Sequence, residues 1–293
     1  MEALTLVPRG PFDLRQAIGF GFGPTRAGED DVLRLAFAAD GTGSPVGAEL
    51  RQAERDGPVI AMAQGEAEPA AVAAQLARSL SLDADGEAWM AGGARESVLG
   101  GLQARFAGLR PVLFHSPYEA ACWAIISARW GRAQAARASE AIAAAHGHGF
   151  KLAGELRHAW PAPARLLAAL DEDRVSGLPG EKLRRLRGVA TAAAAGELDA
   201  ARLHALGPEA AEDAVGALRG FGPFYRSLVV VRAVGFTDAL PADEPRARRS
   251  AAQLHGLPEL DAERFTALAE SWRPFRTWAT VLLRVAAERD GLA

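Results

Sequence analysis

The chain has 293 residues, of which 49% are hydrophobic, enough for a sizeable core in one or two domains. Its single cysteine, Cys122, excludes an internal disulfide framework, a four-cysteine zinc site and a cysteine-held iron–sulfur cluster, and is compatible with a reducing cytoplasm. The N-terminal residues show no apolar run behind a basic start, and no stretch is long and uncharged enough to span a membrane. We therefore expect a cytoplasmic protein.

The net charge of −3 conceals an asymmetry along the chain. Residues 1–103 carry 8 Lys and Arg against 15 Asp and Glu, which gives −7, whereas residues 104–293 carry 25 against 21, which gives +4. A polyanion would therefore meet the C-terminal part, where basic residues gather at Lys182–Arg187 and Arg246–Arg249. Such runs are also typical of solvated helix faces, and charge alone leaves that alternative open.

The first ninety residues predict a mixture of strands and helices. Residues 32–38 alternate between apolar and polar, which is typical of a half-buried strand, and residues 58–63 form a second short apolar run. A helix is expected to begin at Glu68-Pro69, with apolar residues at four-residue spacing from Val72 to Leu80. The pattern predicts a small sheet with one or two helices packed on one side.

From about residue 93 the pattern is helical almost throughout. Apolar residues recur at helical spacing, the breaks are short and contain Gly or Pro, and no long strand competes. Helices are expected over residues 117–130, 132–146, 162–171, 180–195, 208–218, 224–235, 244–254, 261–270 and 275–289.

The stretch Leu218–Tyr225 is the most informative part of the sequence. Gly220 and Gly222 flank Phe221 in a tight turn between two helices. Glycine permits a positive φ and a close backbone approach, and the free N–H groups at the start of the second helix are natural ligands for a phosphate oxygen. An ordinary helix–helix turn is the alternative. The carbonyl groups that would hold a monovalent cation facing such a phosphate are those of Gly216, Leu218 and Gly220.

Other segments extend this pattern over nearly the whole chain. The hairpin is followed by an apolar helix and then by Leu240–Pro245, a loop that carries an Asp. In order and spacing this resembles the helix-hairpin-helix DNA glycosylase superfamily, specifically the bacterial DNA-3-methyladenine glycosylase II type. Leu109–Pro111 with Ser116–Ala120 resembles the family's entry into its helical region, and Trp272–Arg276 resembles its C-terminal Trp-x-Pro-Trp-Arg segment.

The resemblance implies an α+β fold with two domains. Residues 1–92 would form a small α/β domain similar to half of a TATA-binding-protein fold, and residues 93–293 an all-α helix-hairpin-helix glycosylase domain. It implies a monofunctional DNA glycosylase of base excision repair that removes alkylated or otherwise damaged bases from double-stranded DNA. We expect a monomer that needs no organic cofactor and does not associate with a membrane. The alternative is a catalytically altered or inactive scaffold that binds damaged, abasic or bent DNA.

Asp243 is the candidate catalytic residue. Cleavage of the N-glycosidic bond develops positive charge on the sugar, and a carboxylate beside C1′ stabilises that charge and can orient or deprotonate the attacking water. Its alternative role is the N-cap of the following helix. Glu244 is a neighbouring candidate, one position off the family pattern. Family members that also cleave the strand carry a Schiff-base lysine where this chain has Phe224, so no lyase step is expected.

A base must leave the stack to reach the pocket, and a side chain must fill the hole. By resemblance Arg129 is that plug and Trp130 its support; the alternative is a surface or phosphate-binding arginine beside a core tryptophan. The expected DNA-binding set is Gly220, Gly222, Tyr225, Arg129 and Arg246. The expected base pocket comprises Tyr118, Trp123, Phe224, Tyr225, Trp278 and Arg284, although an aromatic residue of this kind is more often part of a core than of a pocket wall.

Three positions depart from the family pattern. Ala128 stands where Gln is usual, Phe224 where Trp is usual, and Arg284 at an aromatic wall position. A pocket for a cationic alkylated purine favours stacked aromatic faces, and an arginine would repel such a base unless it faces away. These departures argue against 3-methyladenine more than against DNA binding, and leave a neutral or differently shaped damaged base open.

Overall fold

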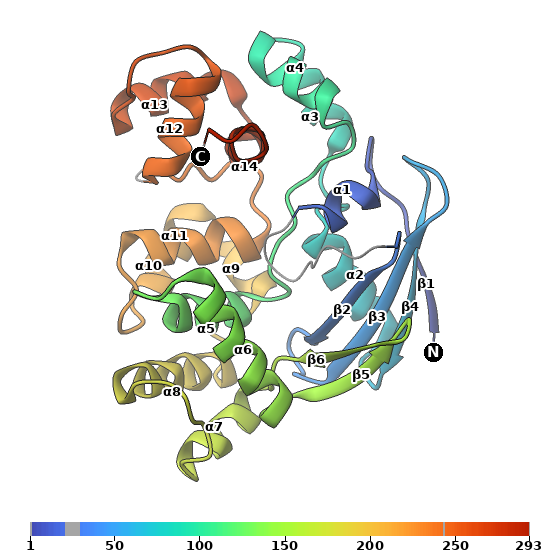
Figure 1. Cartoon of the computed structure of the whole chain (residues 1–293), viewed down its shortest axis with the longest axis vertical. Helices are drawn as coiled ribbons and strands as arrows, with labels where there is room; N and C mark the ends of the chain where they lie inside the picture. The colour runs from blue at the N-terminus through green and yellow to red at the C-terminus, as the bar shows by residue number, and fades with distance from the viewer. Residues whose placement is uncertain (1, 21–29, 243, 293) are drawn as a thin grey trace.

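The structure is a computed structural model of the chain and describes residues 2–20, 30–242 and 244–292. A four-stranded antiparallel sheet lies on one side of the molecule and most helices lie on the other (Figure 1). The strands are β1 (Glu2–Leu6), β2 (Leu33–Ala38), β3 (Pro45–Gln52) and β4 (Val59–Gly65), in the order β1-β4-β3-β2.

Alternation along the strands places their apolar side chains in one layer. In β3, Val46, Ala48 and Leu50 are buried and share a core with the helix α2 (Pro69–Ser79). The side chain of Glu68 caps α2 by accepting hydrogen bonds from two backbone N–H groups, and Pro69 occupies the first turn. The short helix α1 (Leu14–Ile18) lies between β1 and β2 in the sequence.

The helices expected from the sequence are all present, with ends that differ by a few residues, so the α+β prediction is confirmed. They are α5 (Pro117–Ser127), α6 (Arg132–His146), α7 (Pro163–Asp171), α8 (Gly180–Ala194), α10 (Pro208–Gly216), α11 (Pro223–Val229) with the π-helical turn η1 (Val230–Val234), α12 (Pro245–Leu254), α13 (Ala262–Ala269) and α14 (Arg276–Arg289). The helices α3 (Gly86–Gly93), α4 (Ser97–Arg105), α9 (Ala200–Leu206) and the 3-10 turn η2 (Glu270–Trp272) add to them.

Two short strands, which the sequence pattern did not indicate, interrupt the mainly helical region. β5 (His148–Leu152) and β6 (Glu155–Ala159) pair antiparallel and contact β2 and β3. Phe150 packs over Gly47, where a Cβ would come within 2.6 Å of the ring, and Arg34 Nε donates to Leu152 O at 3.2 Å. These strands are fixed by partners about a hundred residues away, which a local pattern cannot reveal.

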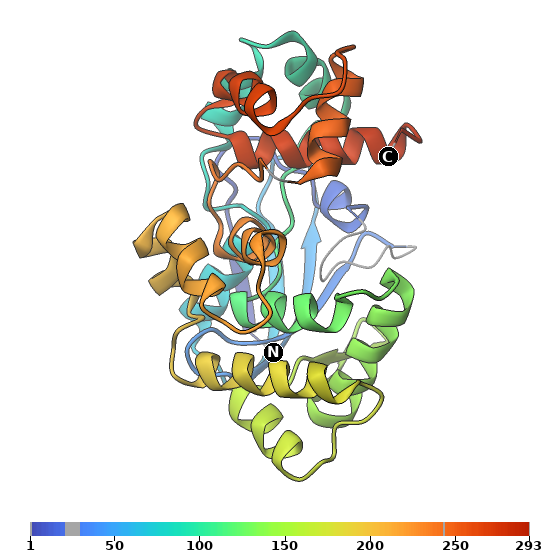
Figure 2. The same ribbon diagram turned by 90° about the vertical axis from the view of Figure 1, so that its left-hand side faces the viewer.

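Two large hydrophobic cores and one small cluster around Phe150 organise the described part of the molecule. The first joins the sheet to the C-terminal helices, so that Leu50 and Leu76 share a core with Phe265 and Trp278. The second lies among α5 to η1 and includes Ile125 and other buried residues of these helices. The C-terminal helices thus lie beside α3 and α4, at the end of the molecule away from the N-terminus (Figures 1 and 2). The domain boundary expected at residue 92 stays a prediction.

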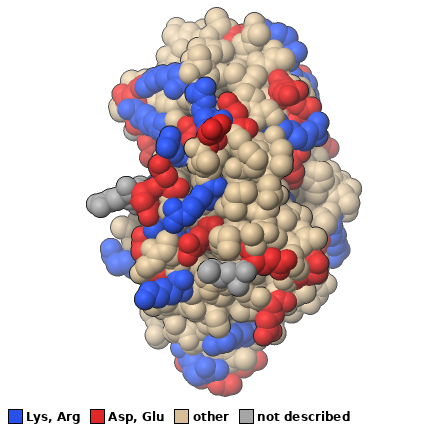
Figure 3. All heavy atoms as spheres, turned by 90° about the vertical axis from the view of Figure 1, so that its right-hand side faces the viewer, with Lys and Arg blue, Asp and Glu red and all other residues tan. Residues whose placement is uncertain are grey.

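The sheet side of the molecule has a mixed surface. Figure 3 shows Lys and Arg interspersed with Asp and Glu there, without a broad basic field among the described residues. This agrees with the acidic balance of residues 1–103 and makes the helical side the better candidate for a polyanion. Within the described parts of the chain, no helix combines the length and apolar character needed to cross a membrane.

Arg110 connects the N-terminal segment to the start of the helical part. Its side chain is 1% exposed and its guanidinium donates to the carbonyl oxygens of Arg9, Gly10, Pro11 and Ser81 at 2.6 to 2.9 Å. Burial lowers its pKa to about 10, so the group stays charged at neutral pH. The segment Leu109–Pro111 therefore has a structural reason to contain an arginine.

We expect Arg110→Met to lower the free energy of unfolding by about 3 kcal/mol or more, because four carbonyl groups in buried or partly buried hydrogen bonds lose their donor. Denaturant titration followed by circular dichroism measures this. Arg9→Met is the control: it removes an exposed ion pair with Asp85 and should cost about 1 kcal/mol or less. Equal losses in the two variants would contradict the assigned role.

Candidate functional site

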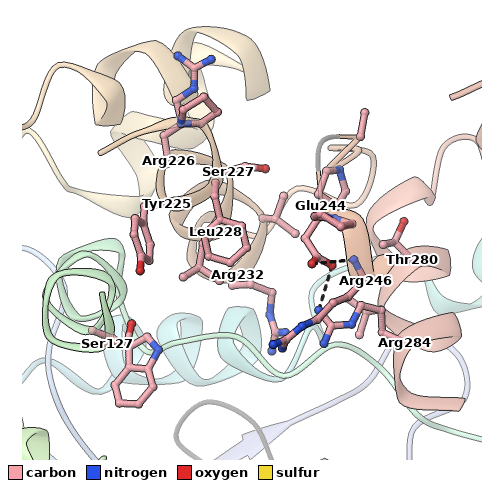
Figure 4. A pocket seen from close by; sticks show the side chains of 18 of the residues that line it. Ser127, Tyr225, Arg226, Ser227, Leu228, Arg232, Glu244, Arg246, Thr280 and Arg284 are labelled. Carbon is pink, nitrogen blue, oxygen red and sulfur yellow. Dashed lines mark hydrogen bonds and ion pairs between the residues drawn. The ribbon is translucent and has the colours of Figure 1, made fainter. Parts of the chain in front are cut away.

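A cavity of about 810 Å³ opens between the C-terminal end of α5, the helix α11 with η1, the loop before α12, and α14 (Figure 4). Two segments separated by more than a hundred residues, around Ser127 and around Glu244, face each other across it. Among the residues expected at a pocket or DNA contact, the following line this cavity: Trp123, Arg129, Phe224, Tyr225, Arg246 and Arg284.

The glycine hairpin connects α10 to α11 beside this cavity. Gly220 has φ +97°, a conformation that favours glycine, and Phe221 is buried in the second core, which anchors the turn. Gly222 is the N-cap of α11 and brings no side chain to the cap. Among the described residues, the exposed N–H groups of Gly220 and Gly222 donate to no protein acceptor. The turn therefore presents two backbone donors to solvent.

Tyr225 differs from the expectation in one respect. Its backbone N–H donates to Gly222 O at 3.0 Å, so this amide is already used within the first turn of α11. Its ring instead lines the cavity opposite Ser127 (Figure 4). Burial raises the pKa of its phenol, and a hydrogen bond with Ser127 offsets part of that shift. Tyr225 is thus placed to contact a ligand through its side chain.

The cation expected at the carbonyls of Gly216, Leu218 and Gly220 stays a prediction. The carbonyl of Leu218 accepts a hydrogen bond from Phe221 N at 3.2 Å, which uses one of its two lone pairs. The described residues bring together no group of three or more His, Cys, Asp or Glu side chains suited to a metal ion.

The turn between α5 and α6 holds Arg129 in an unusual conformation. Its φ is +60°, the left-handed region, which for a residue with a side chain costs on the order of 1 kcal/mol or more and often marks a functional site. Trp130 is packed against the second core, and Lys182 Nζ lies 3.7 Å from the centre of its ring. The exposed arginine therefore projects from a turn that is supported from behind, as a plug would require.

The loop before α12 is clamped to α14 through Asp238. Arg276 binds both carboxylate oxygens at 2.9 Å, and Arg273 Nη1 binds Oδ2 at 2.7 Å. The hydroxyl of Thr277 donates to Ala239 O at 2.7 Å. The Trp272–Arg276 segment thus acts as an anchor for the loop that carries the candidate carboxylate.

Asp243 lies outside the described residues. Its two neighbours, Ala242 and Glu244, both line the cavity. Glu244 is the N-cap of α12 and accepts hydrogen bonds from Arg246 N at 3.0 Å and Ala247 N at 2.8 Å. The cap of this helix is therefore Glu244, the residue next to the one considered for that role.

Two arginines face each other at the inner end of the cavity. Arg284 reaches Glu244 Oε2 with Nη1 at 3.1 Å, and Arg232 extends from η1 toward the same place (Figure 4). Burial lowers the pKa of Arg232 to about 9, and the charge of Arg284 contributes. Sequence reasoning missed Arg232; the available signal was a single charged residue in the apolar run Val229–Val234.

Two expected pocket residues are core residues instead. Tyr118 is 5% exposed, lies in the second core and donates its hydroxyl to Pro161 O at 3.1 Å. Trp278 is 3% exposed and packs against Trp89 and Phe275 in the first core. Both helices bury residues on several faces, so helical spacing alone could not distinguish the side facing the cavity.

Comparison with known proteins gives structural matches only. No family model matches the chain, and no curated protein matches it by sequence. The 3-methyladenine DNA glycosylase from Archaeoglobus fulgidus is similar with a TM-score of 0.80 and 21% identity, over 100% of both chains.

Two further structures are similar and contain DNA. The 8-oxoguanine glycosylase/lyase of Clostridium acetobutylicum, with double-stranded DNA, has a TM-score of 0.71 at 16% identity over 96% of this chain and 93% of its own. The 3-methyladenine DNA glycosylase of Schizosaccharomyces pombe, with abasic DNA, has a TM-score of 0.53 at 20% identity over 70% and 97%. The chain therefore shares, over its whole length, the fold of the Archaeoglobus fulgidus 3-methyladenine DNA glycosylase, the type of fold that the sequence motifs predicted.

Proposed function

We propose that this protein is a monofunctional DNA glycosylase that removes a damaged base from double-stranded DNA. The observation that carries the proposal is the cavity beside the glycine hairpin, whose rim includes the residues on both sides of Asp243. The fold shared with DNA glycosylases supports it, as does the presence of DNA in two similar structures. The partner would be duplex DNA, which the exposed N–H groups of Gly220 and Gly222 would hold by a phosphate.

The proposed reaction is hydrolysis of the bond between the base and C1′ of the sugar. The extruded nucleotide would enter the cavity, and Arg129 would occupy the space it leaves in the duplex. The carboxylate of Asp243 would stabilise the positive charge that develops on the sugar and orient the attacking water. The clamp on Asp238 would keep this loop in place while the DNA is bent.

The absence of a lyase step is part of the proposal. The chain has two lysines, Lys151 and Lys182, and none of the described residues lining the cavity is a lysine. Lys182 Nζ donates to Ile126 O at 2.5 Å and lies on the Trp130 ring, so its amine is already engaged, and Lys182 itself does not line the cavity. Phe224 occupies the position expected for a Schiff-base lysine and is 52% exposed at the cavity rim.

A binding function without catalysis is the second candidate. Arg284 at an aromatic wall position favours it, because it removes a stacking surface that the family pattern includes. In that case the protein would bind abasic or bent DNA by the same hairpin and release no base.

We expect Asp243→Asn to reduce base release by roughly 100-fold or more while leaving affinity for an abasic-site duplex nearly unchanged, because the charge that opposes the developing cation is lost. Chromatography of bases released from damaged DNA measures the rate. Glu244→Gln is the matched comparison, since it removes the neighbouring charge yet keeps an acceptor for the helix cap. Equal release by Asp243→Asn and the unmodified protein would remove Asp243 from the mechanism, and no release by either with DNA still bound would favour the binding function.

We expect Gly222→Ala to fold normally and to bind an abasic-site duplex about tenfold more weakly, the equivalent of one charge-assisted hydrogen bond. The new methyl group meets open space in the free protein but stands where a phosphate would approach. Fluorescence anisotropy at several salt concentrations measures the affinity. Gly101→Ala, which also faces open space but lies on α4, is the control and should bind normally. A normal affinity for Gly222→Ala would argue against the hairpin contact.

We expect no covalent adduct when the protein and damaged duplex are treated with borohydride, because no lysine amine reaches the cavity. Denaturing electrophoresis measures trapping and strand cleavage together. An adduct that Lys182→Arg abolishes would show instead that this amine moves to the sugar.

A further inference from the structure

The cavity is strongly basic. Among the described residues that line it, seven arginines stand against three glutamates. Arg129 comes from the turn between α5 and α6, Arg226 from α11 and Arg246 from the first turn of α12. Arg232 and Arg284 come from η1 and α14 and approach each other at the inner end (Figure 4). A base that enters the cavity therefore meets two guanidinium groups in addition to the apolar side chains of Leu228 and Val281.

The two inner arginines are held in different ways. Arg232 is fixed: its Nη2 donates to Val112 O at 2.6 Å, and its guanidinium lies 5.2 Å from the ring centre of Phe20. Arg284 is held from one side, by the bond between Nη1 and Glu244. Its side chain is 36% exposed, and Glu244 is its hydrogen-bond partner among the described residues. The remaining N–H groups of Arg284 are thus available to a ligand in the cavity.

The charge of the base determines how much electrostatic stabilisation it needs as a leaving group. A cationic base such as 7-methylguanine leaves as a neutral molecule, and a nearby arginine repels it in the ground state. A neutral base leaves with the electron pair of the C1′–N bond and so becomes an anion, which a guanidinium stabilises by charge-assisted hydrogen bonds. Two arginines at the inner end of a cavity therefore favour a neutral base with carbonyl oxygens on its edge.

We propose that Arg284, supported by the fixed charge of Arg232, selects a neutral, carbonyl-bearing base and stabilises it as the departing anion. This rests on the proposed function. In the reaction the C1′–N bond breaks and its electron pair goes to the base nitrogen. Water adds its oxygen to C1′, and the proton that this water loses ends on the base nitrogen. The products are a neutral free base and an abasic site.

A phosphate-binding role for these two arginines is the competing interpretation, and it makes a different prediction. Phosphate contacts carry no base information, so their loss weakens binding to every DNA alike and reduces its salt dependence. The fixed contact between Arg232 and Val112, and the position of Arg284 against Glu244 inside the cavity, favour a contact with the base.

The test compares Arg284→Met with the unmodified protein on two groups of duplexes. One group contains uracil, hypoxanthine or 8-oxoguanine, and the other contains 7-methylguanine; base release and duplex affinity are measured for each. Arg284→Met removes the charge but keeps the length of the side chain, and Arg284→Lys restores the charge without the planar fork. Arg55→Met, on the β3–β4 connection with a side chain 59% exposed, is the control for net charge.

We expect the unmodified protein to release at least one of the neutral bases faster than 7-methylguanine. Arg284→Met should lose roughly 100-fold on that base and change by less than about threefold on 7-methylguanine, the size of effect that one preorganised donor provides. Arg284→Lys should recover part of the loss, and Arg55→Met should behave as the unmodified protein.

Three results would overturn the proposal. Faster release of 7-methylguanine by the unmodified protein would reject the substrate class while leaving the glycosylase function in place. An equal loss of affinity for all duplexes in Arg284→Met would assign the residue to phosphate. Release of none of these bases, with an abasic duplex still bound, would remove the glycosylase function together with this inference.

Discussion

The carboxylate of Asp238 fixes the loop before α12 against the start of α14. It receives both arginines of the Trp272–Arg276 segment, and one of them binds it with both oxygens. The loop that follows Asp238 forms one wall of the cavity and α14 forms another, so their spacing depends on this contact. Bidentate arginine–carboxylate pairs are strong and directional, which suits a loop that has to keep its position when a ligand binds.

A small set of hydrogen bonds connects α2 and the segment before α5 to η1, which lines the cavity. The segment before α5 runs between the two cores: Phe114 N donates to Arg232 O at 2.7 Å, and Arg232 returns a hydrogen bond to Val112 O. Arg78 on α2 adds hydrogen bonds to the carbonyls of His115 and Ala233. Helix α2 and the segment before α5 therefore support η1, which lines the cavity, whereas no described residue of the four-stranded sheet lines it.

The sequence predicted those parts of the structure that depend on local patterns. Helical spacing located the long helices, and the Gly220–Gly222 turn was identified because glycine is required there by a positive φ and by an exposed helix start. The β5–β6 hairpin escaped because its strands are short and depend on Gly47 and Arg34 far away in the chain.

The candidate site was predictable in part, and the reason is geometric. Trp123, Phe224, Tyr225 and Arg284 were assigned to the pocket by motif position and do line the cavity. Tyr118 and Trp278 occupy helices that are buried on several sides. An aromatic side chain at these positions therefore did not indicate whether it faces the cavity or a core. Arg232 escaped because no motif includes it and because a π-helical turn changes which residues face the same side.

That π-helical turn gives the scaffold a simple route to new chemistry. Each residue in a regular helix advances the direction of the side chain by about 100°, and a π turn holds one residue more than the α-helix around it. Loss of a single codon within Val230–Val234 would restore regular geometry while the glycine turn before it and Gly235 after it keep their places. An aliphatic side chain would then take the place of Arg232 at the inner end of the cavity, and this part of the lining would become apolar. An insertion or deletion in this one helical turn would thus change the charge of the cavity lining without changing the residues that α5 and α14 contribute to it.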